Sequence, residues 1–328
     1  MVTWVDDLLT RGSRESTDAF FRAMSDRFDC KHPTYLQEDS SITFTGWEVS
    51  LQRVSGVQTV ALSQTKEMEQ FLQSNGLWEE KLRASPMPER GPLLDRTPIT
   101  AEEQKWCRSV IGELNHFSRS TRYDISHTVS RISGDMRDPV LGTVRAIRYL
   151  AGYLHSTVGL ALSGRIGGGG EDQYEVYSDS DHCGDRHRSS RSHTGVLVLL
   201  NGVPVFWRSN KQTKTSLSPA EAEIYALSEA VRDSRSVAWV LEDMGVTVVW
   251  PIQVKTDSSG AQSFQQDELY STKLKGCFSK REAWVKELRD VDSIITIKVM
   301  DKDNKADILT KCLKAQEFKR QSTQIIDK

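Results

Sequence analysis

The sequence has 328 residues, of which 38% are hydrophobic and 27% charged, and its formal net charge is −2. This length suffices for two or three domains with their own cores, and the composition is that of an ordinary soluble globular protein. No apolar run approaches the ~20 residues of a membrane-spanning helix, and no signal peptide is recognisable, so we expect an intracellular protein, cytoplasmic or nuclear and not secreted.

The cysteines and the charge balance exclude few further classes of protein or binding partner. The five cysteines are scattered without the CxxC spacing of a zinc site, which favours reduced thiols. The net charge averages over local clusters such as the basic run from Arg186 to Arg191, so it does not exclude a polyanionic partner.

Hydrophobic periodicity divides the first part of the chain into short elements. An apolar hairpin over residues 2–10 would carry two acids, Asp6 and Asp7, at its tip. The elements predicted after it are a helix over Glu15–Phe28, strands within Ile42–Leu62 and a helix over Thr65–Asn75.

A proline-rich segment and a glycine-rich segment bracket the middle of the chain. Residues 84–98 hold four prolines and indicate a linker or crossing segment, and residues 164–170 hold five glycines and indicate a flexible joint. Between them the spacing predicts three helices, over Glu103–Ser118, Tyr123–Met136 and Val140–Leu154. The predicted regions are residues 1–83, a helical region 84–163, a linker 164–173, an α/β domain 174–315 and a tail 316–328.

From Tyr174 onward, antiparallel strands precede helix-linked strands, which predicts an α/β fold with a mixed sheet and flanking helices. Asn201-Gly202 is a strong hairpin signal, and Ser218 followed by Pro219 marks a helix start. The predicted strands are Tyr174–Ser180, His193–Leu200, Val203–Ser209, Ile252–Asp257 and Ile294–Met300, and the predicted helices are one from Ser218, a second one ending at Gly245, Thr272–Leu288 and Lys305–Leu313.

Four acids in this domain occupy comparable positions at strand ends and in first helical turns. Mg²⁺ prefers oxygen ligands, and two such ions about 4 Å apart can drive phosphodiester hydrolysis. For any one of these acids taken alone, a solvated carboxylate is the commoner interpretation. The candidates are Asp179, Glu223, Asp257 and Asp307.

The ordered motifs around these acids carry a resemblance. They read Tyr-Ser-Asp-Ser-Asp, Arg-Ser-His-Thr-Gly-Val, Trp-Arg-Ser-Asn-Lys-Gln, Leu-Ser-Pro-Ala-Glu-Ala-Glu-Ile-Tyr-Ala-Leu, Thr-Asp-Ser-Ser-Gly-Ala and Ala-Asp-Ile-Leu-Thr-Lys over residues 177–311. This order resembles the ribonuclease H domain of Ty1/copia-type retrotransposon Pol polyproteins. The resemblance implies a ribonuclease H-like five-stranded sheet and places the family's metal-binding acids on the four candidates, with Glu221 as a weaker competitor for Glu223.

The resemblance continues upstream. Trp4-Val5-Asp6-Asp7 is similar to the palm box of reverse transcriptases, with Trp4 in place of the usual tyrosine. In the family a third palm aspartate lies further upstream than this chain reaches, so we expect no polymerisation by this chain alone, and Asp6 and Asp7 are interpreted as a polymerase remnant within a truncated palm.

Basic side chains near the predicted site are candidates for phosphate contacts, although charge runs are as often solvated faces. They are Arg186, Arg188, Arg191, Lys211, Lys214, Lys273 and Lys275. We interpret the histidines His182, His187 and His193 as surface or substrate-side residues, and Trp207 and Trp239 as core anchors. Residues Thr272–Cys277 stand where the family often has a histidine-containing stretch. We expect the loss of this histidine to affect the reaction rate more than the type of reaction.

The resemblance implies Mg²⁺-dependent endonucleolytic cleavage of RNA in RNA–DNA hybrids, with Asp179 bridging two Mg²⁺ ions, or Mn²⁺ in their place. The implied partners are the hybrid and the rest of a Pol polyprotein, without a membrane. Two alternatives stay open: an inactive retrotransposon relic that only binds nucleic acid, and a reverse transcriptase completed by another chain.

Overall fold

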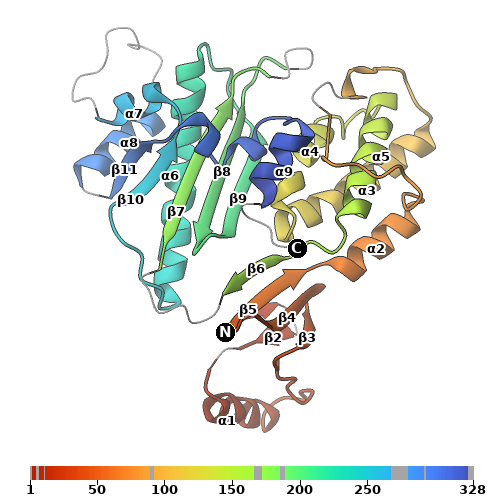
Figure 1. Ribbon diagram of the computed structural model, residues 1–328, viewed down its shortest axis with the longest axis vertical. Coiled ribbons are helices and arrows are strands. Elements are labelled where there is room, and N and C mark those ends of the chain that lie inside the picture. The colour runs from red at the N-terminus through yellow and green to blue at the C-terminus, as the bar shows by residue number, and fades with distance from the viewer. Residues whose placement is uncertain are drawn as a thin grey trace.

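The computed structural model describes residues 2–4, 7–10, 12–88, 92–165, 172–184, 189–266, 280–291 and 293–323 (Figure 1). Its strands form a two-stranded, a four-stranded and a five-stranded sheet. The small sheet pairs β1 (Val2–Trp4) with β2 (Asp7–Leu9), and Trp4 lies opposite Asp7. Asp7 is therefore a strand residue rather than part of the predicted turn.

The four-stranded sheet is built from tight hairpins. Its order is β3-β4-β5-β6, and every pair is antiparallel. The β4–β5 turn has Ser55 and Gly56 at φ 50° and 82°, the left-handed pair that matches the strand twist of a two-residue hairpin. The strands are β3 (Ser40–Phe44), β4 (Trp47–Val54), β5 (Val57–Ser63) and β6 (Leu162–Arg165). Gly164 lies in β6, so the predicted linker begins later than expected.

A group of helices lies beside this sheet, as Figure 1 shows. A capping box starts α3, because the Thr100 hydroxyl accepts from the Glu103 amide while Glu103 accepts from the Thr100 amide. The helix predicted from Tyr123 begins as a 3₁₀ turn and ends earlier than expected. The helices and turns before the second half of the chain are α1 (Arg14–Ser25), α2 (Thr65–Ser74), the turn η1 (Pro92–Leu94), α3 (Ala101–Ser120), the turn η2 (Tyr123–Ile125), α4 (Ser126–Ser133) and α5 (Leu141–Ser156).

The five-stranded sheet has the order β11-β10-β7-β8-β9. Strands β7, β8 and β9 are antiparallel, and β10 is parallel to both β7 and β11, so the predicted fold class of a mixed five-stranded sheet with flanking helices is confirmed. The strands are β7 (Tyr174–Asp181), β8 (His193–Leu200), β9 (Val203–Lys211), β10 (Ile252–Thr256) and β11 (Ile294–Lys298).

Strand alternation sends side chains of this sheet into two separate cores. Val176 and Val198 pack with α6 and its neighbouring helices on one face. Tyr177 and Leu197 pack on the other face with the helical region, including Phe117. The two halves of the chain therefore share one hydrophobic core.

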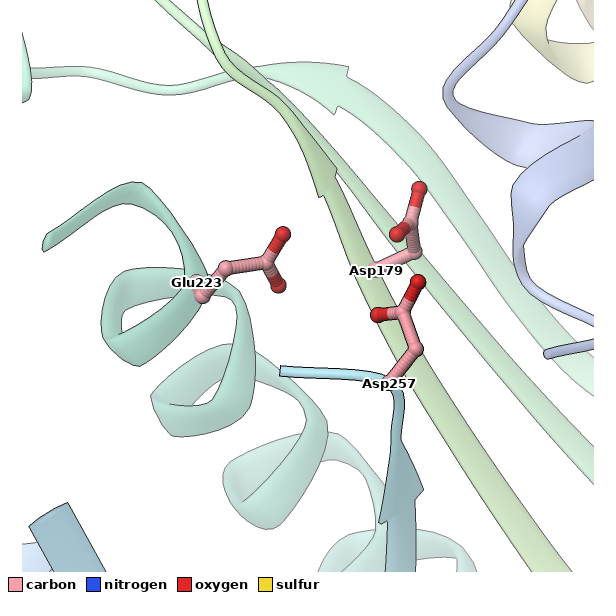
Figure 2. Close-up of side chains that lie close together, drawn as sticks. All are labelled: Asp179, Glu223 and Asp257. Atoms are coloured by element: carbon pink, nitrogen blue, oxygen red, sulfur yellow. The ribbon is translucent and has the colours of Figure 1, made fainter. Parts of the chain in front are cut away.

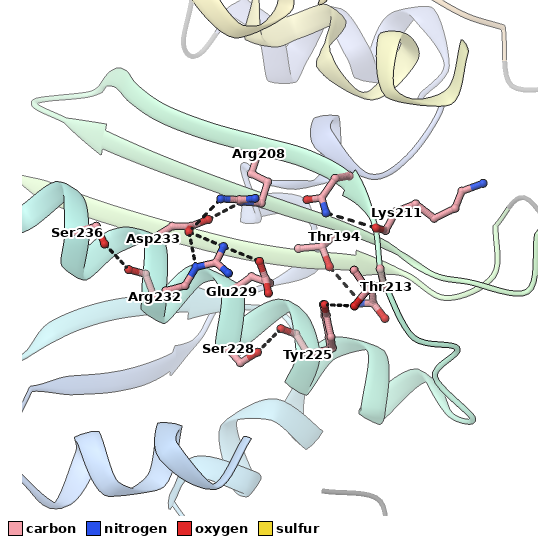
Figure 3. Close-up of polar contacts among 12 residues, drawn as sticks. Thr194, Arg208, Lys211, Thr213, Tyr225, Ser228, Glu229, Arg232, Asp233 and Ser236 are labelled. Atoms are coloured by element: carbon pink, nitrogen blue, oxygen red, sulfur yellow. Dashed lines mark hydrogen bonds and ion pairs between the residues drawn. The ribbon is translucent and has the colours of Figure 1, made fainter. Parts of the chain in front are cut away.

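Helix α6 (Pro219–Asp243) is one continuous helix where two were predicted. An ion-pair network fixes it to β9: Arg208 Nε lies 2.5 Å from Asp233 Oδ2, and Arg232 contacts both Asp233 and Glu229 (Figure 3). Asp233 is buried, so both arginines compensate one desolvated carboxylate.

The remaining helices differ most from prediction. Helix α7 (Ser259–Gln266) was not predicted, and α8 (Lys280–Asp290) overlaps the expected basic helix and ends two residues after it. The last predicted helix is instead the turn η5 (Asp307–Leu309), preceded by η4 (Asp301–Asp303) and followed by α9 (Ala315–Thr323) in the expected tail. Within the described ranges, no helix combines the length and apolarity required to cross a bilayer.

Candidate metal centre

Strand register brings Asp179 and Asp257 to the same sheet edge. Parallel strands β7 and β10 pair Tyr177 with Lys255, so two residues further along each strand the acids come level. Asp179 is buried at 1% exposure in β7, and Asp257 directly follows β10. The carboxyl ends of neighbouring parallel strands are a usual place for a site in α/β folds.

The third carboxylate comes from the first turns of α6. Ser218 caps this helix by accepting from the Glu221 amide, while Glu221 Oε2 accepts from the Leu217 amide at 2.7 Å. Glu221 Oε1 also lies 3.5 Å from Lys214 Nζ, so the Glu221 carboxylate is engaged in contacts at the start of α6. Glu223 instead points toward the two aspartates (Figure 2), and its buried Oε2 has no hydrogen-bond partner.

The side chains of Asp179, Glu223 and Asp257 converge. One oxygen from each lies within 4.8 Å of the others, which is a spacing that a metal ion can bridge. A second group with the same spacing consists of Asp257, Asp301 and Asp307. The structure thus brings all four predicted acids together and adds Asp301, whose exposed position in a short turn gave no signal in the sequence.

A glycine lets the Asp307 segment approach the sheet. Gly195 lies opposite Asp179 on β8, and a Cβ there would lie 2.7 Å from Thr310 Cγ2 and 3.0 Å from the Ala306 carbonyl oxygen. Ser209 Oγ also donates to the Leu309 carbonyl at 2.6 Å. Close packing on β8 therefore places residues 306–311 beside Asp179.

This segment binds Asp179 directly. Thr310 Oγ1 donates to Asp179 Oδ2, and Lys311 Nζ lies 3.6 Å from Asp179 Oδ1 and 2.8 Å from Asp307 Oδ1. Asn304 links the strand ends, since its Nδ2 donates to the Ser178 carbonyl at 3.1 Å and to Asp257 at 3.4 Å. The sequence analysis missed Lys311, although its position four residues after Asp307 was visible in the Ala-Asp-Ile-Leu-Thr-Lys motif.

Burial and mutual repulsion raise the pKa of every predicted acid. Desolvation, then the charges of Asp179 and Asp257, raise the pKa of Glu223 to about 9. Desolvation and Asp179 raise the pKa of Asp307 to about 7, and burial is also the largest cause of the raised pKa values of Asp179 and Asp257. Clustered carboxylates with raised pKa values are typical of a site that gains stability from a cation.

The donor set fits a hard divalent cation. All donors are carboxylate oxygens, and the buried, unpartnered Oε2 of half-buried Glu223 leaves a ligand atom available. The cluster can therefore hold a divalent metal ion. Asp257, rather than Asp179, is the residue common to both groups.

The other predicted site residues lie elsewhere or outside the described ranges. Arg191 is exposed just before β8, and Lys211 ends β9. Lys214 pairs with Glu221 and lies 5.5 Å from the Tyr225 ring centroid. The residues outside the described ranges are Asp6, Arg186, Arg188, Lys273, Lys275 and the substituted stretch 272–277.

Two expectations about single residues are wrong. His193 is buried, and its ring lies 4.7 Å from the His127 ring, so it is not a surface residue. Trp239 is 51% exposed and is not a core anchor, whereas Trp207 Nε1 donates to the Ser118 carbonyl at 2.6 Å inside the shared core region. His182 is half-buried with Nε2 3.3 Å from the Ser216 carbonyl oxygen, and His187 lies outside the described ranges.

Fold and site together define an α/β protein with a cluster of carboxylates that can hold a metal ion. No family model matches the chain. It is 26% identical over 325 residues to the retrovirus-related Pol polyprotein from transposon TNT 1-94 of Nicotiana tabacum, a match covering 97% of this chain and 24% of that protein. It is 24% identical over 327 residues to the Pol polyprotein from transposon RE1 of Arabidopsis thaliana, covering 99% and 21%.

The chain is therefore similar over nearly its whole length to Ty1/copia-type retrotransposon Pol polyproteins, as the sequence resemblance implied. It spans about a quarter of the length of the relatives just named. Among solved structures, LC11-RNase H1 in complex with RNA/DNA hybrid matches 42% of this chain and 94% of its own at 17% identity and a TM-score of 0.31.

Proposed function

We propose that the α/β half of the chain is a ribonuclease H that cleaves the RNA strand of RNA–DNA hybrids with two Mg²⁺ ions. The observation that carries this proposal is the convergence of Asp179, Glu223 and Asp257, with Asp307 in a second group that shares Asp257. Similarity to retrotransposon Pol polyproteins supports a hybrid as substrate, because reverse transcription produces one.

The protein contributes ligand positions, charge and orientation. Bound Mg²⁺ would supply activation of a water molecule and stabilisation of the leaving oxygen. Asp179, Glu223 and Asp257 would hold one ion, and Asp257, Asp301 and Asp307 the other. Thr310 and Asn304 fix Asp179 and Asp257 by hydrogen bonds, so the carboxylates are oriented before substrate arrives.

Substrate contacts outside the carboxylates belong to the same proposal. Arg191, Lys211 and Lys214 would contact phosphates, which position a nucleic acid without reading its sequence. Selectivity for a hybrid would come from groove shape and 2′-OH contacts. The basic residues outside the described ranges, Arg186, Arg188, Lys273 and Lys275, stay in this proposal as further phosphate contacts.

A labelled RNA–DNA hybrid tests the proposal directly. We expect the chain to shorten the RNA strand in Mg²⁺ and not in EDTA, and Asp179→Asn to abolish cleavage while circular dichroism shows an unchanged fold. Cleavage by Asp179→Asn at the wild-type rate would contradict the metal-site assignment. Hybrid binding by the wild-type chain without any cleavage would instead support the alternative of a catalytically inactive binding module.

A further inference from the structure

The Lys311 ammonium lies inside the carboxylate cluster. Its Nζ is 2.8 Å from Asp307 Oδ1 and 3.6 Å from Asp179 Oδ1, and its side chain is 33% exposed. Both contacts join unlike charges in a largely buried setting, where screening by water is weak. Lys311 is therefore the cation that this chain itself supplies to the site.

Local geometry fixes this position. Lys311 lies four residues after Asp307, and its backbone amide donates to the Asp307 carbonyl at 3.0 Å, so the turn brings the two side chains together. Thr310, in the same segment, donates a hydrogen bond from its Oγ1 to Asp179 Oδ2. One oxygen of Asp179 thus faces a hydroxyl, and the other faces an ammonium.

We infer that Lys311 competes with a divalent metal ion for the carboxylate oxygens on the Asp307 side and tunes the affinity of that group. A metal ion at Asp257, Asp301 and Asp307 and an ammonium against Asp307 cannot both be accommodated without repulsion. Metal binding there displaces Nζ toward the solvent-exposed side, where it can meet a substrate phosphate. This inference rests on the proposed function, since it concerns the same metal centre.

The group of Asp179, Glu223 and Asp257 is the internal reference for metal affinity. Lys311 Nζ lies further from Asp179 Oδ1 in this group, at 3.6 Å, than from Asp307 Oδ1 in the other, at 2.8 Å, so Lys311 weakens the first group less. The two groups should therefore bind metal with unequal affinities, and removal of the ammonium should bring those affinities closer together.

Titration calorimetry with Mn²⁺ on the EDTA-treated and dialysed full chain tests this inference. Lys311→Met should strengthen Mn²⁺ binding at the weaker site by about tenfold or more, because a competing unit charge a few ångströms away is removed. Lys311→Gln keeps a hydrogen-bond donor without the charge, and it should also strengthen Mn²⁺ binding at the weaker site. Lys311→Arg should stay near wild type.

Thermal unfolding supplies a second readout. In EDTA, Lys311→Met should unfold at a lower temperature than wild type, because Asp179, Asp257 and Asp307 lose their counter-charge, and Mn²⁺ should raise its Tm by more than it raises the wild-type Tm. Lys314→Met, at an exposed lysine just outside the cluster, is the matched control and should behave as wild type in both measurements.

The outcomes separate the two proposals. Unchanged or weaker Mn²⁺ binding in both Lys311→Met and Lys311→Gln would overturn the competition and leave the metal centre in place. Absence of Mn²⁺ binding in the wild-type chain would overturn the proposed function itself.

Discussion

Glu221 and Glu223 stand two residues apart on α6 and have opposite environments. Glu221 accepts from the Leu217 amide and faces Lys214, which is the chemistry of a helix start. Glu223 is turned toward Asp179 and Asp257, and burial, followed by the charges of these two aspartates, raises its pKa. The sequence motif alone could not decide between them without the family resemblance, because both glutamates lie in the first turns of the helix.

This pair gives a matched prediction. Glu223→Gln should lower hybrid cleavage by about 100-fold or more, since a ligand worth several kcal/mol of charge stabilisation is lost. Its unfolding free energy in EDTA near pH 7 should change by less than about 1 kcal/mol, because Glu223 with a pKa of about 9 is already protonated there.

Glu221→Gln is the control for this experiment. Glutamine can still accept from the Leu217 amide, so cleavage should stay near wild type and urea unfolding should show a loss of under about 1 kcal/mol. Equal losses of cleavage in the two variants would contradict the assignment of Glu223 to the metal centre.

At the scale of elements, α4 and β8 meet through two buried histidines. The rings of His127 and His193 lie edge to face, and His193 Nε2 lies 3.0 Å from Ser209 Oγ. Burial, and then the positive charges of Lys211 and Arg131, lower the pKa of His193 to about 3, and burial also lowers the pKa of His127. Both rings are therefore neutral in the folded protein.

A pH-dependent stability follows from this pair. The unfolded chain takes up protons below the ordinary histidine pKa of about 6.5, while folded His193 does so only near 3. The contribution of these histidines to the unfolding free energy should therefore be fully present above pH 6.5 and fall on acidification, by up to about 1.4 kcal/mol per pH unit for each histidine. The raised pKa values of Glu223 and Asp307 act in the opposite direction over the same range, so the histidine contribution is measured as a difference between variants. Urea unfolding of the EDTA-treated chain between pH 7 and 5 measures this slope.

The variant His193→Gln supplies the comparison. An amide can keep a hydrogen bond to Ser209 without titrating, so the slope of unfolding free energy against pH between pH 7 and 5 should decrease by up to about 1.4 kcal/mol per pH unit relative to wild type, although the stability at pH 7 falls. An unchanged slope would show that other groups cause the acid sensitivity.

Elements with strong local signals were predictable, and elements defined by tertiary contacts were not. The Asn201-Gly202 turn and the Ser218 cap are local chemistry, and both lie where the sequence placed them. Residues 305–313 have helical periodicity, yet only Asp307–Leu309 form a short turn, because this segment packs on Gly195 and hydrogen-bonds Ser209. The strand acids were predictable for the same local reason, whereas Asp301 and Lys311 reach the site only through the folded chain.

At the scale of the whole molecule, the five-stranded sheet serves two cores. Leu197 and Leu199 face the helical region together with Ile308 and Leu309, while Val196 and Val198 face α6. The segment that carries Asp307 is thus packed partly by residues from the first half of the chain, although the acids that cluster with Asp307 come from the second half.

A fragment of residues 172–323 tests this dependence. Removing the first half exposes the apolar face that contains Leu197 and Ile308, so the fragment should unfold at a lower temperature than the full chain and bind the dye ANS. Its Mn²⁺ affinity should fall most at the group containing Asp307. A fragment with the full-chain Tm would show that the shared core contributes little to the metal centre.

The glycine opposite Asp179 has a consequence for judging which related chains keep the acidic cluster intact. Alanine at position 195 adds one methyl group, and that methyl would collide with Thr310 and the Ala306 carbonyl. On the proposed function, a related chain that retains all four acids but has lost this glycine should not cleave hybrids. A comparison of related chains that considers only their acidic residues would overlook this position, because glycine has no side chain.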